Sequence, residues 1–386
     1  MADSSEKTHE QVQEYYGQRV KSTDQLLTTA CTVISGEGSG KVKAAIKNVH
    51  PDVLSKYYGC GLVFPEQVED CRILDLGSGA GRDCFVLSQL VGANGHVTGV
   101  DMTQEQLDVA NKHIQYHTEK FGYSKSNVDF KKGFIENLSD AGISDSSYDI
   151  VISNCVVNLA HDKLSVLKGA YNALKDGGEL YFSDVYVDRP VPDELRKNSV
   201  LWGECISGAL YWKDLVMIAA EVGFAPPVVV SATAISTCGK GAEALLDAVK
   251  SDPSISSNPE LLKLLGQLSV ASVTYRLFKV PKTALTSDSP VQVTYKGTID
   301  GHAEEFKLSY DLSLQKSIPV VLPQSVAEMF TSGRLKQHFD ISPTSAESPS
   351  TSYKNLDQFN RVNPFEVIST PAPSTGSCCQ GSSCCS

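Results

Sequence analysis

The sequence ILDLGSGAGRD, residues 73–83, decides the fold class. It reads as a short apolar strand, a turn with glycines at positions 77, 79 and 81, and the start of a helix. Because glycine has no Cβ, the backbone can bend sharply there and approach a ligand closely. Asp75 stands near the carboxyl end of the strand, where open α/β sheets bind their ligands. The stretch therefore predicts the first strand–turn–helix unit of a nucleotide-binding α/β domain.

A second carboxylate follows at a suitable spacing. Asp101 closes the next strand-like run, HVTGVD at 96–101. A carboxylate in that place accepts hydrogen bonds from the two hydroxyls of a ribose. A tight turn without a ligand is the alternative, but the turn, Asp75 and Asp101 occur together and in order. Arg82 stands where a dehydrogenase fingerprint has its third glycine, so the pattern D-x-G-x-G-x-G differs from that of nicotinamide-binding enzymes.

Strand-like and helix-like segments alternate along most of the chain. A helical pattern over 103–117, TQEQLDVANKHIQYH, opens with a Thr cap and is typical of the segments between strands. The alternation predicts a parallel sheet with helices on both faces. We expect the last strand to be an edge or inserted strand, because a polar excursion over 239–260 precedes it. The strand-like runs are 72–76, 96–101, 128–130, 148–153, 178–185, 227–234 and 272–280.

The chain of 386 residues is long enough for one large and one smaller domain. Residues 291–312 alternate apolar with polar and turn at Asp300-Gly301, which predicts a β-hairpin. The C-terminal remainder is rich in Ser, Thr and Pro, and it reads as a disordered tail that ends in SCCQGSSCCS. We expect an N-terminal arm over 1–45, the main α/β domain over 46–281, a small α+β domain over 284–340 and the tail over 341–386.

Charge and hydropathy narrow the range of partners. Lys and Arg total 34 against 45 Asp and Glu, a formal net charge of −11, whereas a nucleic-acid partner requires a basic footprint. No stretch approaches the length of a membrane span, and the first residues carry no apolar segment of signal-peptide length. We therefore expect a cytoplasmic protein with no nucleic-acid or membrane partner. Nothing indicates an obligate assembly, so we expect a monomer.

Eleven cysteines form the most unusual feature of the composition. Their odd number, without a secretion signal, does not indicate an extracellular disulfide framework. A zinc finger is also a poor fit, because the sequence has no CxxC pair followed by a second one. Cys60 in YYGCG, Cys155 in SNCVVNL and Cys205 in WGECISG belong to three separate segments that the fold can bring together above the sheet. Thiolates are soft ligands and select soft acceptors. Taken singly, each cysteine can equally be a small buried apolar residue.

An oxygen or carbon acceptor generally requires a positioned base. His161 and Asp162 are the nearest candidates after SNCVVNL, but HDKLSVLKGAYNAL reads better as the start of a helix with an acidic first turn.

The pattern D-x-G-x-G-x-G resembles motif I of the class I, Rossmann-like S-adenosylmethionine-dependent methyltransferases. The resemblance covers roughly residues 46–281 and implies a seven-stranded sheet whose last strand is antiparallel. It implies that the glycine turn faces the methionine part of the cofactor, that Asp101 holds the ribose, and that the residues after the second and third strands contact the adenine. The candidate cofactor contacts are Tyr58, Asp75, Gly77, Ser78, Gly79, Asp101, Met102, Ile135, Glu136 and Asn154.

YYGCG, ILDLGSGAGRD, SNCVVNL and WGECISGALY together resemble the family of arsenite S-adenosylmethionine methyltransferases, and the match extends to Cys31 in TTACTV. The resemblance implies that Cys155 and Cys205 hold arsenite and its methylated products, with Cys60 as the third As(III) ligand in the first round. Cys31 and Cys60 are implied in disulfide exchange that returns pentavalent arsenic to the trivalent state. Thioredoxin or glutathione would then restore the thiols.

Two other functions remain open from the residues themselves. One is a C-methyltransferase that acts on a lipid or quinone-like acceptor, and the other is a soft-metal-binding protein without turnover. The paired cysteines of the tail are either a mobile metal trap or an unselected chain end.

Overall fold

The computed structural model describes most of the chain. Cys31 and nearly all of the predicted arm and tail lie outside the described residues. The described residues are 9–10, 12–15, 40–198, 201–202, 205–235, 252–285, 289–344 and 363–368.

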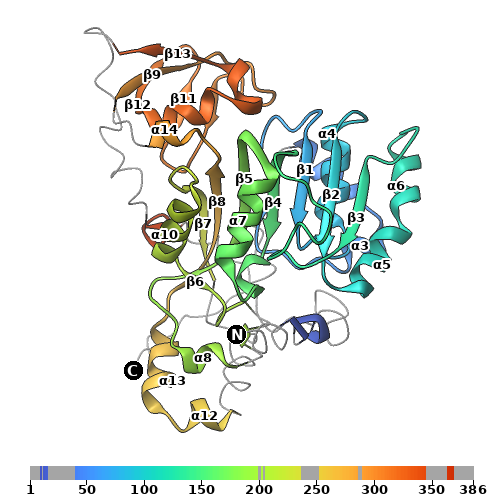
Figure 1. Cartoon of the computed structure of the whole chain (residues 1–386), viewed down its shortest axis with the longest axis vertical. Coiled ribbons are helices and arrows are strands. Elements are labelled where there is room, and N and C mark those ends of the chain that lie inside the picture. The colour runs from blue at the N-terminus through green and yellow to red at the C-terminus, as the bar shows by residue number, and fades with distance from the viewer. Residues whose placement is uncertain are drawn as a thin grey trace, which may run out of the picture.

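A mixed sheet forms the centre of the main domain (Figure 1). Its strand order is β3-β2-β1-β4-β5-β8-β7, and a short β6 (Leu210–Tyr211) pairs beside β5. The first five strands are parallel, whereas β8 runs antiparallel between β5 and β7. The seven predicted strands are thus confirmed, and the last of them is inserted. Their bounds are β1 Arg72–Leu76, β2 His96–Asp101, β3 Val128–Lys132, β4 Tyr148–Asn154, β5 Leu174–Val187, β7 Val228–Ala234 and β8 Val270–Phe278.

Helices cover both faces of this sheet, as predicted. On one face Ile73 of β1 packs in a core with α2 and α4, and on the other face Leu74 packs with α7 and α10. Successive side chains of a strand point to opposite faces, so a strand covered on both sides is apolar throughout. The helices of the main domain are α2 Gly40–Lys47, α3 Pro51–Leu54, α4 Arg82–Val91, α5 Gln104–Lys112, α6 Ile114–Lys120, α7 Lys163–Ala173 and α10 Trp212–Val222.

Two helix predictions can be compared with the structure. The pattern over 103–117 forms two helices, because His113 ends α5 and begins α6. Asp162 caps α7, since its carboxylate accepts a hydrogen bond from the Ser165 N–H over 3.0 Å. The segment from His161 is therefore a helix start, as its sequence indicates.

The C-terminal segment forms its own small sheets, and here the predicted hairpin is wrong. The chain does turn at Asp300-Gly301, but β9 (Pro290–Tyr295) does not pair with the strand that follows the turn. β9 lies instead between β12 (Pro319–Pro323) and β13 (Phe339–Pro343). The alternating apolar side chains of β9 are buried in a core to which these later strands contribute. The segment after the turn forms β10 (Glu305–Lys307), which pairs with β11 (Ser313–Gln315); short helices α14 (Lys282–Leu285) and α15 (Gln324–Ala327) complete the region.

A buried ion-pair network joins this C-terminal region to the start of β5. Glu179 is fully buried, and its carboxylate accepts hydrogen bonds from Arg276 Nε over 2.8 Å and from Arg334. Burial alone would raise the pKa of Glu179, but the charges of Arg276 and Arg334 outweigh it and lower the pKa. The C-terminal region thus packs against the amino end of β5.

Helices α8 (Asp193–Arg196), α12 (Pro253–Ser256) and α13 (Pro259–Gln267) lie at the opposite end of the sheet (Figure 1). Side chains of all three helices share a buried cluster with Val185 and Val187, at the carboxyl end of β5. The carboxyl ends of the strands, where a ligand site is expected, are therefore bordered by these helices and lie away from the C-terminal region.

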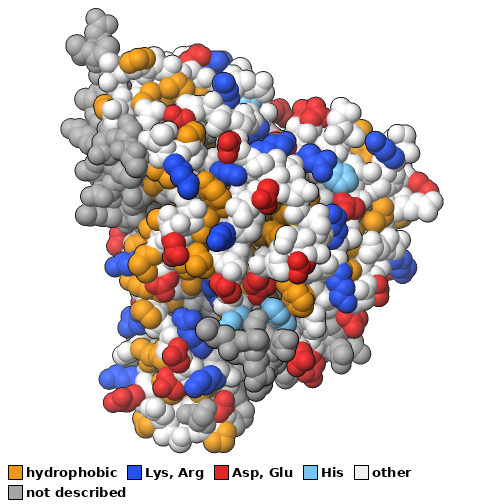
Figure 2. Space-filling model, in the orientation of Figure 1, with side chains coloured by type: hydrophobic (Ala, Val, Ile, Leu, Met, Phe, Trp, Pro, Cys, Tyr) orange, Lys and Arg blue, Asp and Glu red, His pale blue; other side chains and the backbone are white. Residues whose placement is uncertain are grey.

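The described surface is mixed in charge. On the face shown in Figure 2, Lys and Arg side chains are interspersed with Asp and Glu. None of the described helices is long and apolar enough to cross a membrane.

Candidate active site

A cavity opens at the carboxyl ends of β1, β2 and β4. The space within it, including its open mouth, is about 960 Å³. All ten residues predicted to contact the cofactor line this one cavity, and Cys155 lines it as well. These ten are Tyr58, Asp75, Gly77, Ser78, Gly79, Asp101, Met102, Ile135, Glu136 and Asn154.

Two glycines of the turn line the cavity, and both have a backbone conformation that requires glycine. Gly77 and Gly79 have φ values of 73° and 52°, in the left-handed region that other residues rarely adopt. A Cβ on Gly77 would lie 2.4 Å from Cγ1 of Val156. A Cβ on Gly79 would meet no described atom within 4 Å, so this position leaves space for a ligand against the backbone.

Asp101 is held in place by the turn that it faces. Its two carboxylate oxygens accept hydrogen bonds from the backbone N–H of Gly79 over 2.9 Å and of Thr103 over 2.8 Å. Burial raises the pKa of Asp101, although these hydrogen bonds oppose the shift. Each oxygen keeps a second lone pair for a ligand hydroxyl, as ribose binding requires.

Asp75 lies deeper, beneath the turn, and only 3% of it is exposed. The Cys84 thiol donates a hydrogen bond to Asp75 Oδ2 over 3.1 Å. Burial, and after it the charge of Asp83, raises the pKa of Asp75 to about 8. Asp101 and Glu136 also line the cavity, together with Lys56 and an ion pair between Arg82 and Asp83.

Asn154 connects the cavity to the segment YYGCG. Its side-chain oxygen accepts the Cys60 N–H over 2.9 Å. Its side-chain nitrogen lies within 3.0 Å of the Tyr57 hydroxyl, the Gly61 carbonyl and Asp83 Oδ2. Asn154 therefore positions the segment that carries Cys60, in addition to lining the cavity.

Two of the predicted arsenic-binding thiols, those of Cys60 and Cys155, lie together beside the cavity. The ligand atoms of Cys60, Cys155 and Asp184 all lie within 4.8 Å of one another, and the three residues are buried. The Cys205 thiol donates a hydrogen bond to the Cys155 carbonyl over 3.6 Å. Cys205 also shares a buried cluster with Cys60 and Cys155. Three separate segments thus bring their thiols to one region beside the cavity.

The backbone at two of these cysteines is strained. Cys155 and Cys205 both have a φ of 60°, in the left-handed region. Such a conformation costs a residue other than glycine about 1–3 kcal/mol and is concentrated at functional sites. At Cys155 it occurs directly after β4 ends at Asn154, where it turns the chain away from the strand.

Asp184 lies beside these thiols and was not predicted from the sequence as a site residue. Its carboxylate accepts hydrogen bonds from the Asn158 backbone N–H over 3.0 Å, the Asn158 side chain over 2.7 Å and the Val185 N–H over 2.8 Å. The available signal was a carboxylate near the carboxyl end of the strand run at 178–185, whose other carboxylate, Glu179, is near its start.

Part of the N-terminal arm also lines the cavity, which was not predicted from the sequence. The Gln13 side chain donates a hydrogen bond to the Met102 carbonyl over 3.0 Å, and the His9 ring lies 3.0 Å from Glu136 Oε1. Val12 and His9 both line the cavity. These residues therefore cover the region where the adenine contacts are predicted.

The domain that holds the cavity is a methyltransferase domain. A family model described as "Methyltransferase domain" matches residues 67–223, from just before β1 to the end of α10. The fold and cavity define a Rossmann-like, S-adenosylmethionine-dependent methyltransferase, and S-adenosylmethionine is its cofactor. The carboxylates that line the cavity fit the positive charges of this cofactor.

The chain belongs to the arsenite methyltransferase family. A second family model, "Arsenite methyltransferase C-terminal domain", matches residues 288–385. The chain is 44% identical to the arsenite methyltransferase of Rattus norvegicus over 96% of both chains. It is 45% identical to that of Homo sapiens over 88% of this chain and 85% of the relative.

A solved structure supports the same assignment. The arsenic(III) S-adenosylmethionine methyltransferase of Chlamydomonas reinhardtii superimposes with a TM-score of 0.70 at 41% identity. The match covers 82% of this chain and 99% of that chain.

Proposed function

We propose that the protein transfers the methyl group of S-adenosylmethionine to trivalent arsenic that is held by cysteine thiolates. The observation that carries this proposal is the convergence of the Cys60 and Cys155 sulfurs within 4.8 Å, beside the cofactor cavity. The Cys205 thiol, in contact with the Cys155 carbonyl, supplies the third sulfur.

The transfer requires alignment and no protein base. Trivalent arsenic bound by three thiolates keeps a lone pair, which attacks the methyl carbon as the bond from that carbon to the sulfonium sulfur breaks. The sulfonium becomes a neutral thioether, and the positive charge moves to arsenic. The protein contributes by holding the two reactants in line and excluding water.

Asp184 is placed to stabilise this charge. Its buried carboxylate lies within 4.8 Å of the sulfurs of Cys60 and Cys155, so it is near any arsenic that they bind. Hydrogen bonds from Asn158 and Val185 hold this carboxylate in position. A preorganised anion beside a centre that gains positive charge stabilises the transition state relative to the bound reactants.

The successive rounds of methylation require different cysteines. Monomethylated arsenic has one valence occupied by carbon, so two thiolates suffice, and we assign these to Cys155 and Cys205. Cys60 is the third ligand for arsenite. Oxidation of Cys31 and Cys60 to a disulfide supplies the two electrons that return pentavalent arsenic to the trivalent state, and thioredoxin or glutathione reduces the disulfide. The role of Cys31 is supported by the sequence resemblance alone.

Incubation of the purified protein with arsenite, glutathione and methyl-labelled S-adenosylmethionine tests the proposal. We expect the label on arsenic and stoichiometric S-adenosylhomocysteine. Arsenic binding without cofactor turnover would instead indicate a metal-binding protein. Turnover only after addition of a lipid or quinone-like acceptor would indicate a C-methyltransferase. A thiol cycle of this kind requires a reducing compartment such as the cytoplasm, where we place the protein as a monomer.

A further inference from the structure

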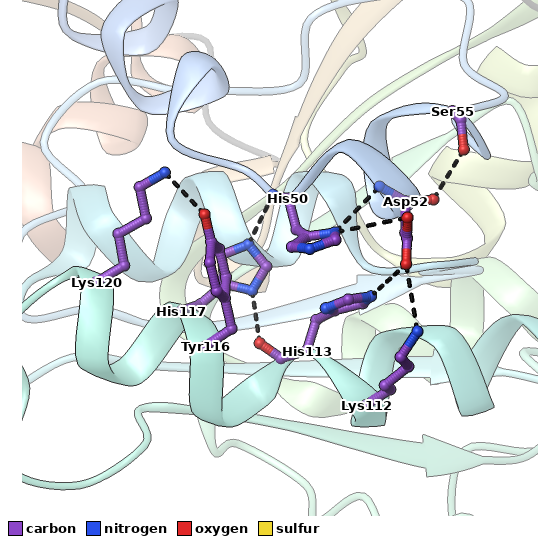
Figure 3. Close-up of polar contacts among 8 residues, drawn as sticks. All are labelled: His50, Asp52, Ser55, Lys112, His113, Tyr116, His117 and Lys120. Atoms are coloured by element: carbon purple, nitrogen blue, oxygen red, sulfur yellow. Dashed lines mark hydrogen bonds and ion pairs between the residues drawn. The ribbon is translucent and has the colours of Figure 1, made fainter.

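A second group of potential metal ligands lies apart from the thiols. Among the described residues, His50, Asp52 and His113 place one ligand atom each within 4.8 Å of one another (Figure 3). His50 precedes α3, which Asp52 helps to form, and His113 stands at the junction of α5 and α6. We call these three residues the His50 cluster.

The spacing within the His50 cluster suits a tetrahedral cation. His113 Nε2 lies 3.2 Å from Asp52 Oδ2, and His50 Nδ1 lies 3.9 Å from Asp52 Oδ1. In Figure 3 both rings present a nitrogen to the Asp52 carboxylate. Two ligands bound at about 2.05 Å in a tetrahedron lie about 3.3 Å apart, which is close to the separation of His113 from Asp52.

His117 holds the backbone of both histidine ligands. Its Nε2 accepts the His50 N–H over 3.1 Å, and its Nδ1 lies 2.7 Å from the His113 carbonyl (Figure 3). A neutral imidazole donates at one nitrogen and accepts at the other, as these two contacts require. Its ring also stacks on Phe85 at 3.7 Å. Supporting contacts of this kind orient metal ligands before the metal binds.

The two ligand rings lie face to face. The rings of His50 and His113 stack at a centroid distance of 3.9 Å. Because the lone pair of an imidazole nitrogen lies in the plane of its ring, both rings must turn for these nitrogens to meet at one ion.

Three existing contacts would have to be exchanged on metal binding, and two of them are at the surface. Lys112 Nζ lies 3.3 Å from Asp52 Oδ2, but its side chain is 69% exposed and can turn to solvent. The Asp52 N–H, which donates to His50 Nδ1 over 3.1 Å, is at the surface and can bind water instead. The proton on His113 Nε2 leaves to solvent or moves to Nδ1.

We propose that His50, Asp52 and His113 bind one divalent cation, with water as the fourth ligand. Two imidazoles and one carboxylate in a tetrahedral arrangement match Zn²⁺ best. The cation would fix the segment after His50, which continues into YYGCG, to the junction of α5 and α6. This site is independent of the arsenic chemistry.

Titration of the full, reduced chain with Co²⁺ tests the proposal. Co²⁺ bound by thiolates shows an intense charge-transfer absorption, and Co²⁺ bound by nitrogen and oxygen does not, so the probe separates this site from the cysteines. His113→Phe retains the ring stack, and His50→Asn retains a side chain that caps α3. His96→Gln is the control, because His96 pairs with Asp129 over 2.6 Å as a single His–Asp contact.

We expect the wild type and His96→Gln to bind one more equivalent of Co²⁺ than His113→Phe and His50→Asn. The absorption spectrum of this additional Co²⁺ should lack the thiolate charge-transfer band. In His113→Phe and His50→Asn, the affinity for this additional Co²⁺ should fall by at least about tenfold. Circular dichroism of the metal-free proteins checks their folding, and if one variant fails to fold the other decides. Equal stoichiometry and affinity in all four proteins, or a thiolate band on the lost equivalent, would overturn the proposal.

Discussion

The sulfur of Cys60 and the sulfur of Cys155 lie within 4.8 Å of each other, although Cys60 precedes the first strand and Cys155 follows the fourth. Ser183 of β5 contacts both residues: its hydroxyl lies 3.5 Å from Cys60 Sγ, and its carbonyl accepts the Cys155 N–H over 2.8 Å. The central sheet therefore sets the separation of the two thiols. Substrate binding needs little rearrangement of the backbone to bring them together.

Replacing Asp101 by Ala should weaken cofactor binding by about 2–4 kcal/mol, because two charge-assisted hydrogen bonds to the ribose are lost. Asp101→Asn removes the charge but keeps the size of the side chain, so it shows how much of the effect is due to the charge. The exposed Glu105→Ala on α5 is the control. Calorimetric titration with S-adenosylhomocysteine measures the effect, and unchanged affinity in a folded Asp101→Ala protein would remove Asp101 from the site.

Binding of S-adenosylmethionine should release a proton at pH 7. Asp75, with its pKa raised to about 8 by burial and by Asp83, is largely protonated in the free protein. A cationic ligand favours the carboxylate and lowers that pKa, so affinity should rise with pH up to about 8 and then level off.

Calorimetry in two buffers of different ionisation enthalpy counts the released protons. Asp75→Asn should abolish the buffer dependence. A wild-type binding enthalpy that is independent of the buffer at pH 7 would show that Asp75 does not exchange its proton with this ligand.

Asp184→Asn should slow methyl transfer by about a hundredfold and leave the KM for S-adenosylmethionine unchanged, because the charge matters only as arsenic becomes positive. Asp188→Asn, at an accessible carboxylate just beyond β5, is the matched control. Single-turnover rates of arsenite methylation measure the effect, with thermal denaturation as the folding check. A folded Asp184→Asn enzyme with the wild-type rate would exclude this role.

Arg334→Met should destabilise the protein by about 3 kcal/mol, because Glu179 then keeps only part of its compensating charge in a fully buried position. The folded pKa of Glu179 lies below its ordinary value of 4.5, so the ion pairs stabilise the protein above that pH. This stability is lost as the pH falls through the folded pKa.

The acid unfolding midpoint of Arg334→Met should therefore move to higher pH than that of the wild type. Lys336→Met, at an exposed position two residues further on, should change neither the free energy of unfolding nor the acid unfolding midpoint. Equal midpoints for the wild type and Arg334→Met would mean that Arg334 does not stabilise the Glu179 charge.

The sequence predicted the features that local chemistry determines. A turn that needs glycine at 77 and 79, with Asp101 at the end of the next strand, leaves few alternatives, and the cavity forms around those residues. The apolar strand runs predicted the sheet because each must be buried on both faces.

Non-local pairing could not be predicted in the same way. A period of two shows that one face of β9 is buried, but not that its partners are β12 and β13 rather than the next strand in sequence. Asp184 was missed for a similar reason, since a carboxylate in an apolar strand shows its function only once Cys60 lies beside it. The boundaries at 45, 281 and 340 remain predictions.

Single cysteine replacements test the central claim most directly. Cys155→Ser and Cys205→Ser should abolish methylation of both arsenite and monomethylarsenite, because a hydroxyl is a harder ligand and is not ionised near neutral pH. Cys60→Ser and Cys31→Ser should stop methylation of arsenite yet spare that of monomethylarsenite when an external thiol is supplied. Cys71→Ser, whose buried thiol donates to the Gln67 carbonyl over 3.6 Å, is the control.

The decisive measurement is the rate at which Cys155→Ser, shown to be folded by circular dichroism, methylates monomethylarsenite in the presence of an external thiol. If Cys155 is one of the two thiolates that hold arsenic in every round, no methyl transfer should be detected, while the Cys71→Ser control keeps the wild-type rate. A folded Cys155→Ser enzyme that methylates monomethylarsenite at the wild-type rate would contradict the account.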